Sequence, residues 1–164
     1  MCGDAIDFKD DGNTVLTGSY RQEDVLELWD IRTFKKVRTI DWNGPKNSEP
    51  IHEELEDDKK EEEENKENEN PVPTQVEGFG RENPAPFIYS AMFNNKTNVV
   101  MAAGAGANQV RLFDYETGNV LCVISDLPKA ILTLTKANTS NDFAFGSVDS
   151  KIRIMTQRNL KEPL

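Results

Sequence analysis

Two apolar runs, Thr14–Ser19 (TVLTGS) and Val25–Asp30 (VLELWD), are joined by a short charged segment. Each run has the length of a β-strand. In the second run, Glu27 and Trp29 alternate with leucines, which is the side-chain period of a strand. The two runs therefore predict a β-hairpin in the middle of a sheet that is packed on both faces.

The same pattern returns twice along the chain. The second copy is Val99–Gly104 (VVMAAG) followed by Val110–Asp114 (VRLFD). The third copy is Phe143–Ser147 (FAFGS) followed by Ile152–Met155 (IRIM). An internal repeat of paired strands predicts an all-β architecture built from similar units.

The copies are regularly spaced. Gly104 and Gly146 are 42 positions apart, and so are Phe113 and Met155, whereas Gly18 and Gly104 are 86 apart, about one period plus a long insertion. A period of roughly 40–45 residues with a Gly-Ser hairpin and a terminal Trp-Asp is typical of propeller blades. The chain thus resembles the WD40 repeat family, and the resemblance implies one four-stranded blade for each repeat.

The terminal dipeptide of the repeat weakens along the chain. Trp29-Asp30 matches the family pattern, the second copy has Phe113 before its aspartate, and the third copy has Met155 followed by threonine. Trp29, Phe113 and Met155 recur at equivalent positions, so we interpret them as packing residues of the blades rather than as a ligand-binding box.

Other family positions are only partly filled. Cys2–Asp4 stands where the family has Gly-His, and Asp149 matches its hairpin-turn aspartate, for which Asn108 and Glu23 are the candidates in the other copies. The resemblance therefore implies that the family's buried network of His, Asp, Ser and Trp is incomplete in this chain.

The repeats divide the chain into four parts. We expect a first WD40-like repeat at 1–43, a disordered acidic low-complexity insertion at 44–86, a second repeat at 87–127 and a third, incomplete repeat at 128–164. The predicted fold class is therefore all-β, a partial WD40-type β-propeller of about three blades with a long disordered acidic insertion.

Three blades are too few for a ring, because propellers typically have about four to eight and the WD40 family usually has seven. The sheets at the two ends of a three-blade arc would each leave a face that a neighbouring blade should cover. The chain also starts directly on an inner strand and stops after a third strand. We therefore expect either the C-terminal three blades of a longer propeller or a chain that needs another subunit to complete the ring.

The net charge of −10 is concentrated in the insertion. Residues 53–69 hold eleven acids and three lysines, a net charge of −8, so the remaining chain is close to neutral. Such a segment buries too little apolar surface to offset its ordering entropy. We interpret it as a solvated, disordered insertion, with an acidic recruitment arm for a basic partner as the functional alternative.

Composition also restricts the location and the partners. The absence of a surplus of Lys and Arg disfavours nucleic-acid binding. No apolar run is long enough for a membrane helix, and the residues at the start predict no signal peptide. Cys2 and Cys122 have no metal or redox spacing, which is typical of thiols in a reducing compartment. We expect a cytoplasmic protein, with a cytoskeleton- or cilium-associated scaffold as one option.

No constellation for catalysis, a cofactor or a metal is recognisable. The only histidine, His52, lies in the acidic insertion without an ordered base or nucleophile beside it. The Gly104–Gly106 segment is followed by a strand instead of a helix, so it lacks the helix N-terminus that binds a dinucleotide phosphate. The acids at 53–69 contain no Gly-centred calcium loop.

The resemblance implies a non-enzymatic scaffold that presents blade loops to other proteins. The candidate partner-binding residues are Arg21, Gln22, Glu23 and Asp24 in the first hairpin turn, and Lys151 and Arg153 near the third. For each of them a merely solvated turn residue is the alternative. Two other functions remain open, a truncated, non-autonomous propeller fragment without specific binding and a fragment of a propeller-type enzyme.

Overall fold

The computed structural model of the chain describes residues 4–45 and 86–156. Within them the secondary structure consists of strands, without a helix. The strands are β1 (Ile6–Phe8), β2 (Thr14–Gly18), β3 (Leu26–Asp30), β4 (Lys35–Ile40), β5 (Phe87–Asn94), β6 (Val99–Ala105), β7 (Val110–Asp114), β8 (Val120–Ile124), β9 (Ile131–Lys136), β10 (Asp142–Ser147) and β11 (Ile152–Thr156).

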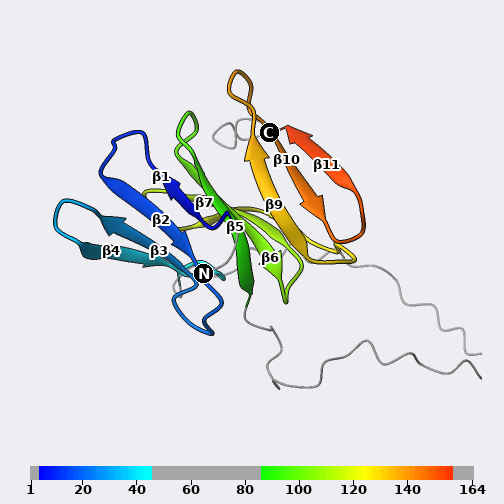
Figure 1. Cartoon of the computed structure of the whole chain (residues 1–164), viewed down its shortest axis with the longest axis horizontal. Coiled ribbons are helices and arrows are strands. Elements are labelled where there is room, and N and C mark those ends of the chain that lie inside the picture. The colour runs from blue at the N-terminus through cyan, green and yellow to red at the C-terminus, as the bar shows by residue number, and fades with distance from the viewer. Residues whose placement is uncertain (1–3, 46–85, 157–164) are drawn as a thin grey trace, which may run out of the picture.

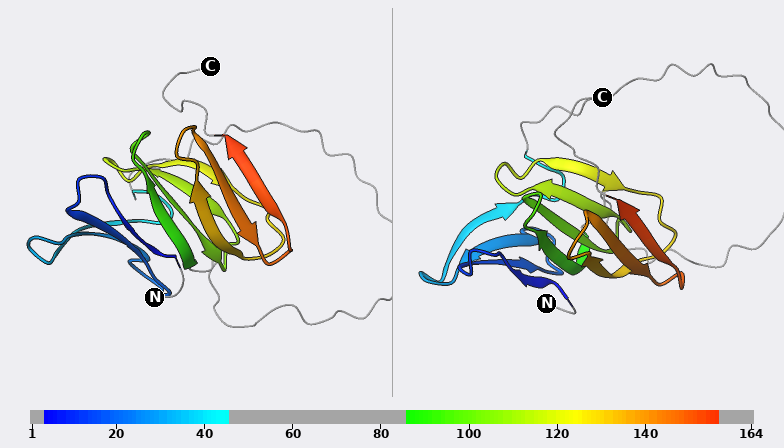
Figure 2. Two further views of the ribbon diagram at one scale, coloured as in Figure 1. Left: turned by 45° about the horizontal axis from the view of Figure 1, so that its top comes forward. Right: turned by 90° about the horizontal axis from the view of Figure 1, so that it is seen from above.

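The strands form three antiparallel sheets, in each of which consecutive strands are neighbours. Sheet A contains β1 to β4, sheet B contains β5 to β8, and sheet C contains β9 to β11. Sheet B lies between the other two (Figure 1), with β5 next to β1 and β2 on one side and next to β9 on the other. Figure 2 shows the same side-by-side order from two further directions.

The all-β fold is confirmed, and three sheets stacked side by side are compatible with a fragment of a β-propeller. The hairpin predicted at 14–30 is also confirmed as β2 and β3, with Val15 opposite Trp29. The prediction that this hairpin is packed on both faces is confirmed for one face only. Leu16 and Leu28 are buried against sheet B, whereas Val15 and Trp29 on the other face are half-buried, and no sheet lies on that side in the described structure.

The apolar core is divided between the two places where sheets meet. The cluster between sheets A and B is centred on Leu16, Leu26, Leu28, Ile88, Phe93 and Phe113. The cluster between sheets B and C is centred on Met101, Val110, Leu112, Leu134, Phe143 and Phe145. Because sheet B is buried on both faces, its strand β6 is apolar throughout.

Strand register shows which residues of the three sheets are equivalent. Trp29, Phe113 and Met155 stand opposite Val15, Val100 and Phe143, so the predicted equivalence of these three residues is confirmed. The alignment of the glycines is off by one in the second copy. Gly18 and Gly146 stand opposite Leu26 and Ile152, but Ala103, not Gly104, stands opposite Val110. Six residues separate Ala103 from Val110, but five separate Gly146 from Ile152, so a spacing of 42 cannot connect equivalent positions on both strands.

The remaining predictions on organisation fall partly outside the described residues. The acidic segment at 53–69 lies there entirely, as do His52 and Cys2. In sheet A the outer strand β4 pairs with β3, and in sheet B the outer strand β8 pairs with β7. Among the described residues sheet C has no corresponding fourth strand.

Candidate functional site

The loops between the second and third strand of each sheet lie at one common edge, which we call the rim. They are residues 19–25, 106–109 and 148–151, and Figure 1 shows all three at the lower edge of the sheets. Each loop has a non-glycine residue with positive φ two positions before its third strand: Asp24 (54°), Asn108 (49°) and Ser150 (63°). A residue in the left-handed conformation therefore turns the chain at the rim of each of the three sheets.

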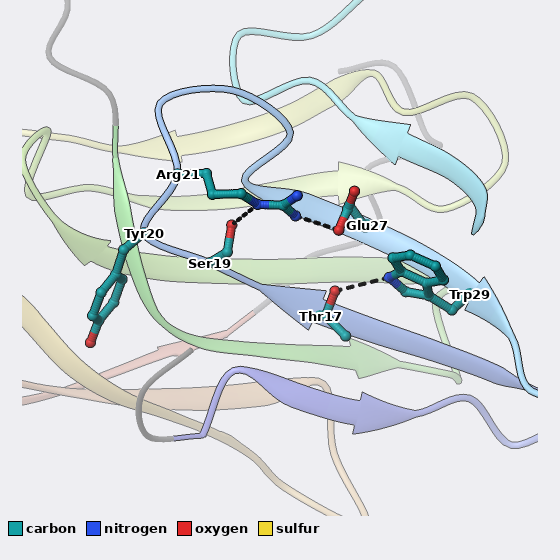
Figure 3. A pocket seen from close by; sticks show the side chains of 6 residues that line it. All are labelled: Thr17, Ser19, Tyr20, Arg21, Glu27 and Trp29. Atoms are coloured by element: carbon teal, nitrogen blue, oxygen red, sulfur yellow. Dashed lines mark hydrogen bonds and ion pairs between the residues drawn. The ribbon is translucent and has the colours of Figure 1, made fainter. Parts of the chain in front are cut away.

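On sheet A the rim loop borders an open hollow of about 560 Å³. Figure 3 shows its lining residues, Thr17, Ser19, Tyr20, Arg21, Glu27 and Trp29. The Tyr20 ring packs edge-on against Tyr89 of β5, with 5.3 Å between the ring centroids. Tyr20 thus forms one wall of the hollow and is supported by sheet B, and strands β2 and β3 form the floor.

Two charged residues that line the hollow, Arg21 and Glu27, belong to a cluster of four with Asp24 and Lys36. The Glu27 side chain is only 6% exposed and pairs with Arg21 through one oxygen and with Lys36 (3.2 Å) through the other. Lys36 also donates to Asp24 (3.2 Å) in the loop. Hydrogen bonds to Asp24 and then to Glu27 raise the pKa of Lys36. A buried carboxylate is costly unless it is paired, so both cations hold Glu27 in place.

The indole of Trp29 completes the floor of the hollow. Its Nε1 donates to the Thr17 hydroxyl across the strand pair at 3.2 Å (Figure 3). This bond fixes the ring against β2 and satisfies its only polar atom. The hollow therefore combines a fixed aromatic surface with a half-exposed guanidinium.

On sheet B the rim carries a cation that the sequence did not single out. Arg111, equivalent to Glu27 by register, lies over the Trp42 ring with 4.9 Å between guanidinium carbon and ring centroid. It donates to the Trp42 carbonyl (2.5 Å) and to Gln109 (2.9 Å). Burial lowers the pKa of Arg111. No local sequence pattern could have identified Arg111, because its contact with Trp42 joins two residues that are far apart in the sequence.

On sheet C the predicted residues lie beside the third rim loop. Arg153 Nη2 pairs with Asp149 at 2.6 Å, and the Lys151 amide donates to the same carboxylate at 3.1 Å. The hydrogen bonds from Arg153, followed in size by the one from the Lys151 amide, lower the pKa of Asp149 to about 2. Arg153 is therefore positioned by an ion pair, and Lys151 is exposed.

The structure brings only part of the predicted site together. Arg21 and Asp24 meet in the charged cluster of sheet A, and Gln22 and Glu23 are exposed at the tip of the same loop. Lys151 and Arg153 belong to the same rim, but sheet B lies between the two sets. The residues thus line one edge of the fold without forming one compact pocket.

Within residues 4–45 and 86–156, no three His, Cys, Asp or Glu side chains are grouped so that they could hold a metal ion. The described part of the chain contains no helix that is long and apolar enough to cross a membrane. No protein-family model matches the chain, and no curated protein is detectably similar to it in sequence.

Proposed function

We propose that the three sheets are blades of a partial WD40-type propeller. Three observations support this fold assignment: the equivalent strand registers, the stacking of the sheets side by side, and the hydrogen bond from Trp29 to Thr17. The bond joins a Trp to a hydroxyl side chain, and the buried network of this family likewise contains a Trp and the hydroxyl residue Ser.

The aspartate of the terminal dipeptide has the same local role in sheets A and B. Asp30 Oδ1 accepts the amides of Arg32 (2.8 Å) and Thr33 (3.4 Å), and Asp114 Oδ1 accepts the amide of Thr117 (2.8 Å). Both carboxylates thus close the turn that leads to the outer strand. A Trp-Asp or Phe-Asp pair therefore marks the end of the third strand in each of these repeats.

The function we propose is that of a non-enzymatic scaffold that binds other proteins at the rim. The observation that carries the proposal is the charged hollow of sheet A, which is lined by Arg21, held by the buried Glu27, and by the Trp29 indole, held by Thr17. Charged and aromatic groups held on a rigid sheet suit peptide binding, because little side-chain entropy is lost on contact. The cations of sheets B and C extend the same edge.

A peptide-display selection on the full chain tests this proposal. Selected peptides are remeasured by calorimetry against Arg21→Gln and Lys151→Ala, with Val37→Lys on the outer strand as the matched control. We expect tenfold or greater weakening, about 1.4 kcal/mol, for at least one rim variant and no change for the control. Selection of no binding peptide by a folded chain would favour the truncated, non-binding fragment instead.

Deletion of residues 53–69 tests the alternative that the acidic insertion, rather than the rim, binds the partner. If the selected peptides are basic and lose affinity on this deletion while the rim variants bind normally, the insertion is the binding element. If the deletion leaves affinity unchanged, the rim remains the site. Circular dichroism of each variant shows whether the β-sheet content is retained.

A further inference from the structure

The third strands of the three sheets carry a charged residue at one equivalent position. By register these residues are Glu27 in sheet A, Arg111 in sheet B and Arg153 in sheet C. Glu27 is paired with two cations, and Arg153 Nη2 is paired with Asp149 at 2.6 Å. Within residues 4–45 and 86–156, Arg111 forms no ion pair. Of the three equivalent charges, that of Arg111 is therefore the one that the described part of the chain leaves without a counter-ion.

Arg111 is a half-buried cation at the junction of sheets A and B. Trp42, which follows β4 of sheet A, is 6% exposed and lies beneath its guanidinium. Both walls of this junction are present, so the access of solvent to Arg111 does not depend on the uncovered end sheets. Burial lowers the pKa of Arg111, and the Asp41 carboxylate opposes this effect without forming an ion pair. A partly desolvated cation costs free energy unless an anion compensates it.

Two amide side chains are oriented by the same guanidinium. Arg111 Nε donates to Gln109 Oε1 (2.9 Å), and Nη1 donates to Asn43 Oδ1 (3.3 Å). Because each amide oxygen faces the arginine, each NH2 group is turned away from it and can only donate. In the described structure neither NH2 group makes a hydrogen bond, and neither does Arg111 Nη2. Asn43 is exposed and Gln109 is half-buried, so this cluster presents a positive charge and several N–H donors to solvent.

We propose that Arg111 binds a side-chain carboxylate of a protein partner, with the amides of Asn43 and Gln109 as additional donors. A carboxylate is planar and matches the fork of a guanidinium, and hydrogen bonds between two charged groups are the stronger ones. Arg111 adjoins the rim loop at 106–109. The inference therefore rests on the proposed function of the rim, and it names the partner there as an acidic peptide.

The first test uses a small probe and does not depend on the affinity of any peptide. N-acetyl-glutamate N-methylamide is titrated into the full chain, and the arginine Nε–H signals are followed by NMR. We expect a saturable shift of the Arg111 signal and no shift with the corresponding glutamine compound, which has the same shape without the charge. The Arg153 signal is the internal control, because this guanidinium is already paired. No shift of the Arg111 signal, or a stronger response to inorganic phosphate, would overturn the proposal.

A variant that supplies the anion within the chain tests the charge without truncating Arg111. Asn43→Asp places a carboxylate where an amide oxygen now lies 3.3 Å from Nη1. It should abolish the shift with glutamate and raise the thermal midpoint, and the fold should be retained because Asn43 is exposed. Asn138→Asp, in the exposed turn between β9 and β10 at the edge opposite the rim (Figure 1), is the matched control and should bind glutamate normally. Normal binding by Asn43→Asp would contradict the proposal.

Peptides selected by display on the full chain form the second test. We expect them to be enriched in aspartate and glutamate and to bind at least about tenfold more weakly to Asn43→Asp and to Arg111→Gln. Arg111→Lys should lose less, because it keeps the charge but not the fork. A folded chain that selects no peptide contradicts the rim function itself. Peptides without an acidic preference that bind Asn43→Asp normally contradict only the present inference.

The acids at 53–69 of the same chain are the competing source of a carboxylate. Deletion of these residues should leave the affinity of Arg111 for N-acetyl-glutamate N-methylamide unchanged if the carboxylate comes from a partner. A clear gain in affinity on deletion, absent in Asn43→Asp, would show that the chain's own acids occupy Arg111, and it would overturn the proposal.

Discussion

The indole Nε1 of Trp29 donates to the hydroxyl of Thr17 at 3.2 Å, joining the third and second strands of sheet A beneath the rim hollow. Thr17→Val keeps the shape of the side chain but removes the acceptor. Because the indole N–H is then left without this partner in a half-buried site, we expect a loss of about 1 kcal/mol in the free energy of unfolding. Urea denaturation measures it.

The control for that variant is Thr33→Val, whose side chain is exposed in the turn after β3. We expect the control to change the unfolding free energy by less than about 0.5 kcal/mol. An equal effect of both variants would show that the Trp29–Thr17 bond does not contribute.

Phe34 and Gly118 occupy the same place in the turns before the outer strands, four residues after Asp30 and Asp114, and both have positive φ (54° and 76°). A left-handed conformation costs an L-residue about 1–2 kcal/mol, and Phe34 is 85% exposed, so it gains little from burial. Phe34→Gly should therefore raise the unfolding free energy by about 0.5 kcal/mol after the entropy cost of glycine.

Gly118→Ala is the reciprocal test. An added Cβ would meet only Arg38 Nη1 at 3.9 Å, so any loss reflects backbone strain rather than a clash. We expect a loss of about 1 kcal/mol, opposite in sign to Phe34→Gly. Thermal or urea unfolding of the two variants decides whether the turns are equivalent.

Gly104 at the end of β6 has no room for a side chain. A Cβ there would lie 1.7 Å from the Phe87 carbonyl oxygen, a backbone atom held by the pairing of β5 with β6. Gly104→Ala should lower the unfolding free energy by at least about 3 kcal/mol or prevent folding. Gly146→Ala is the matched control, because its Cβ would meet only a Thr133 methyl at 3.2 Å. We expect it to cost within about 1 kcal/mol.

The Asp149 carboxylate makes the stability of the folded protein depend on pH. Its carboxylate is bound by Arg153, and its pKa in the folded protein is about 2, below the ordinary value of 3.8. The folded state therefore favours the ionised form. The stabilisation is complete above about pH 4 and is lost as the pH falls from there through about 2.

The variant Asp149→Asn removes that dependence. Its denaturation midpoint should lie below that of the wild type at neutral pH, and the difference should shrink as the pH is lowered toward 2. Gln22→Ala, at an exposed and uncharged position of the first rim loop, is the control, and its midpoint should differ from that of the wild type by the same amount at every pH. If the difference in denaturation midpoint between Asp149→Asn and the wild type is constant over this pH range, the lowered pKa of Asp149 is contradicted.

The periodic pattern of the sequence was sufficient for the strands and for the repeat. Alternation and turn residues are local, so the hairpin at 14–30 and the strands at Val110–Asp114 and Val120–Ile124 could be predicted closely. The recurrence of Trp29, Phe113 and Met155 likewise gave the correct equivalence of third strands, because a repeated fold places repeated residues in register.

Only the tertiary structure decided which faces are covered and which charges meet. The pattern at Ile152–Met155 is that of a buried strand, yet Ile154 is exposed in the described structure. Its burial would require a neighbouring sheet, and no local pattern encodes one. The contact of Arg111 with Trp42 likewise joins segments that are far apart in the sequence. Periodicity fixes the direction of a side chain relative to its own strand, whereas burial and pairing depend on what lies across the interface.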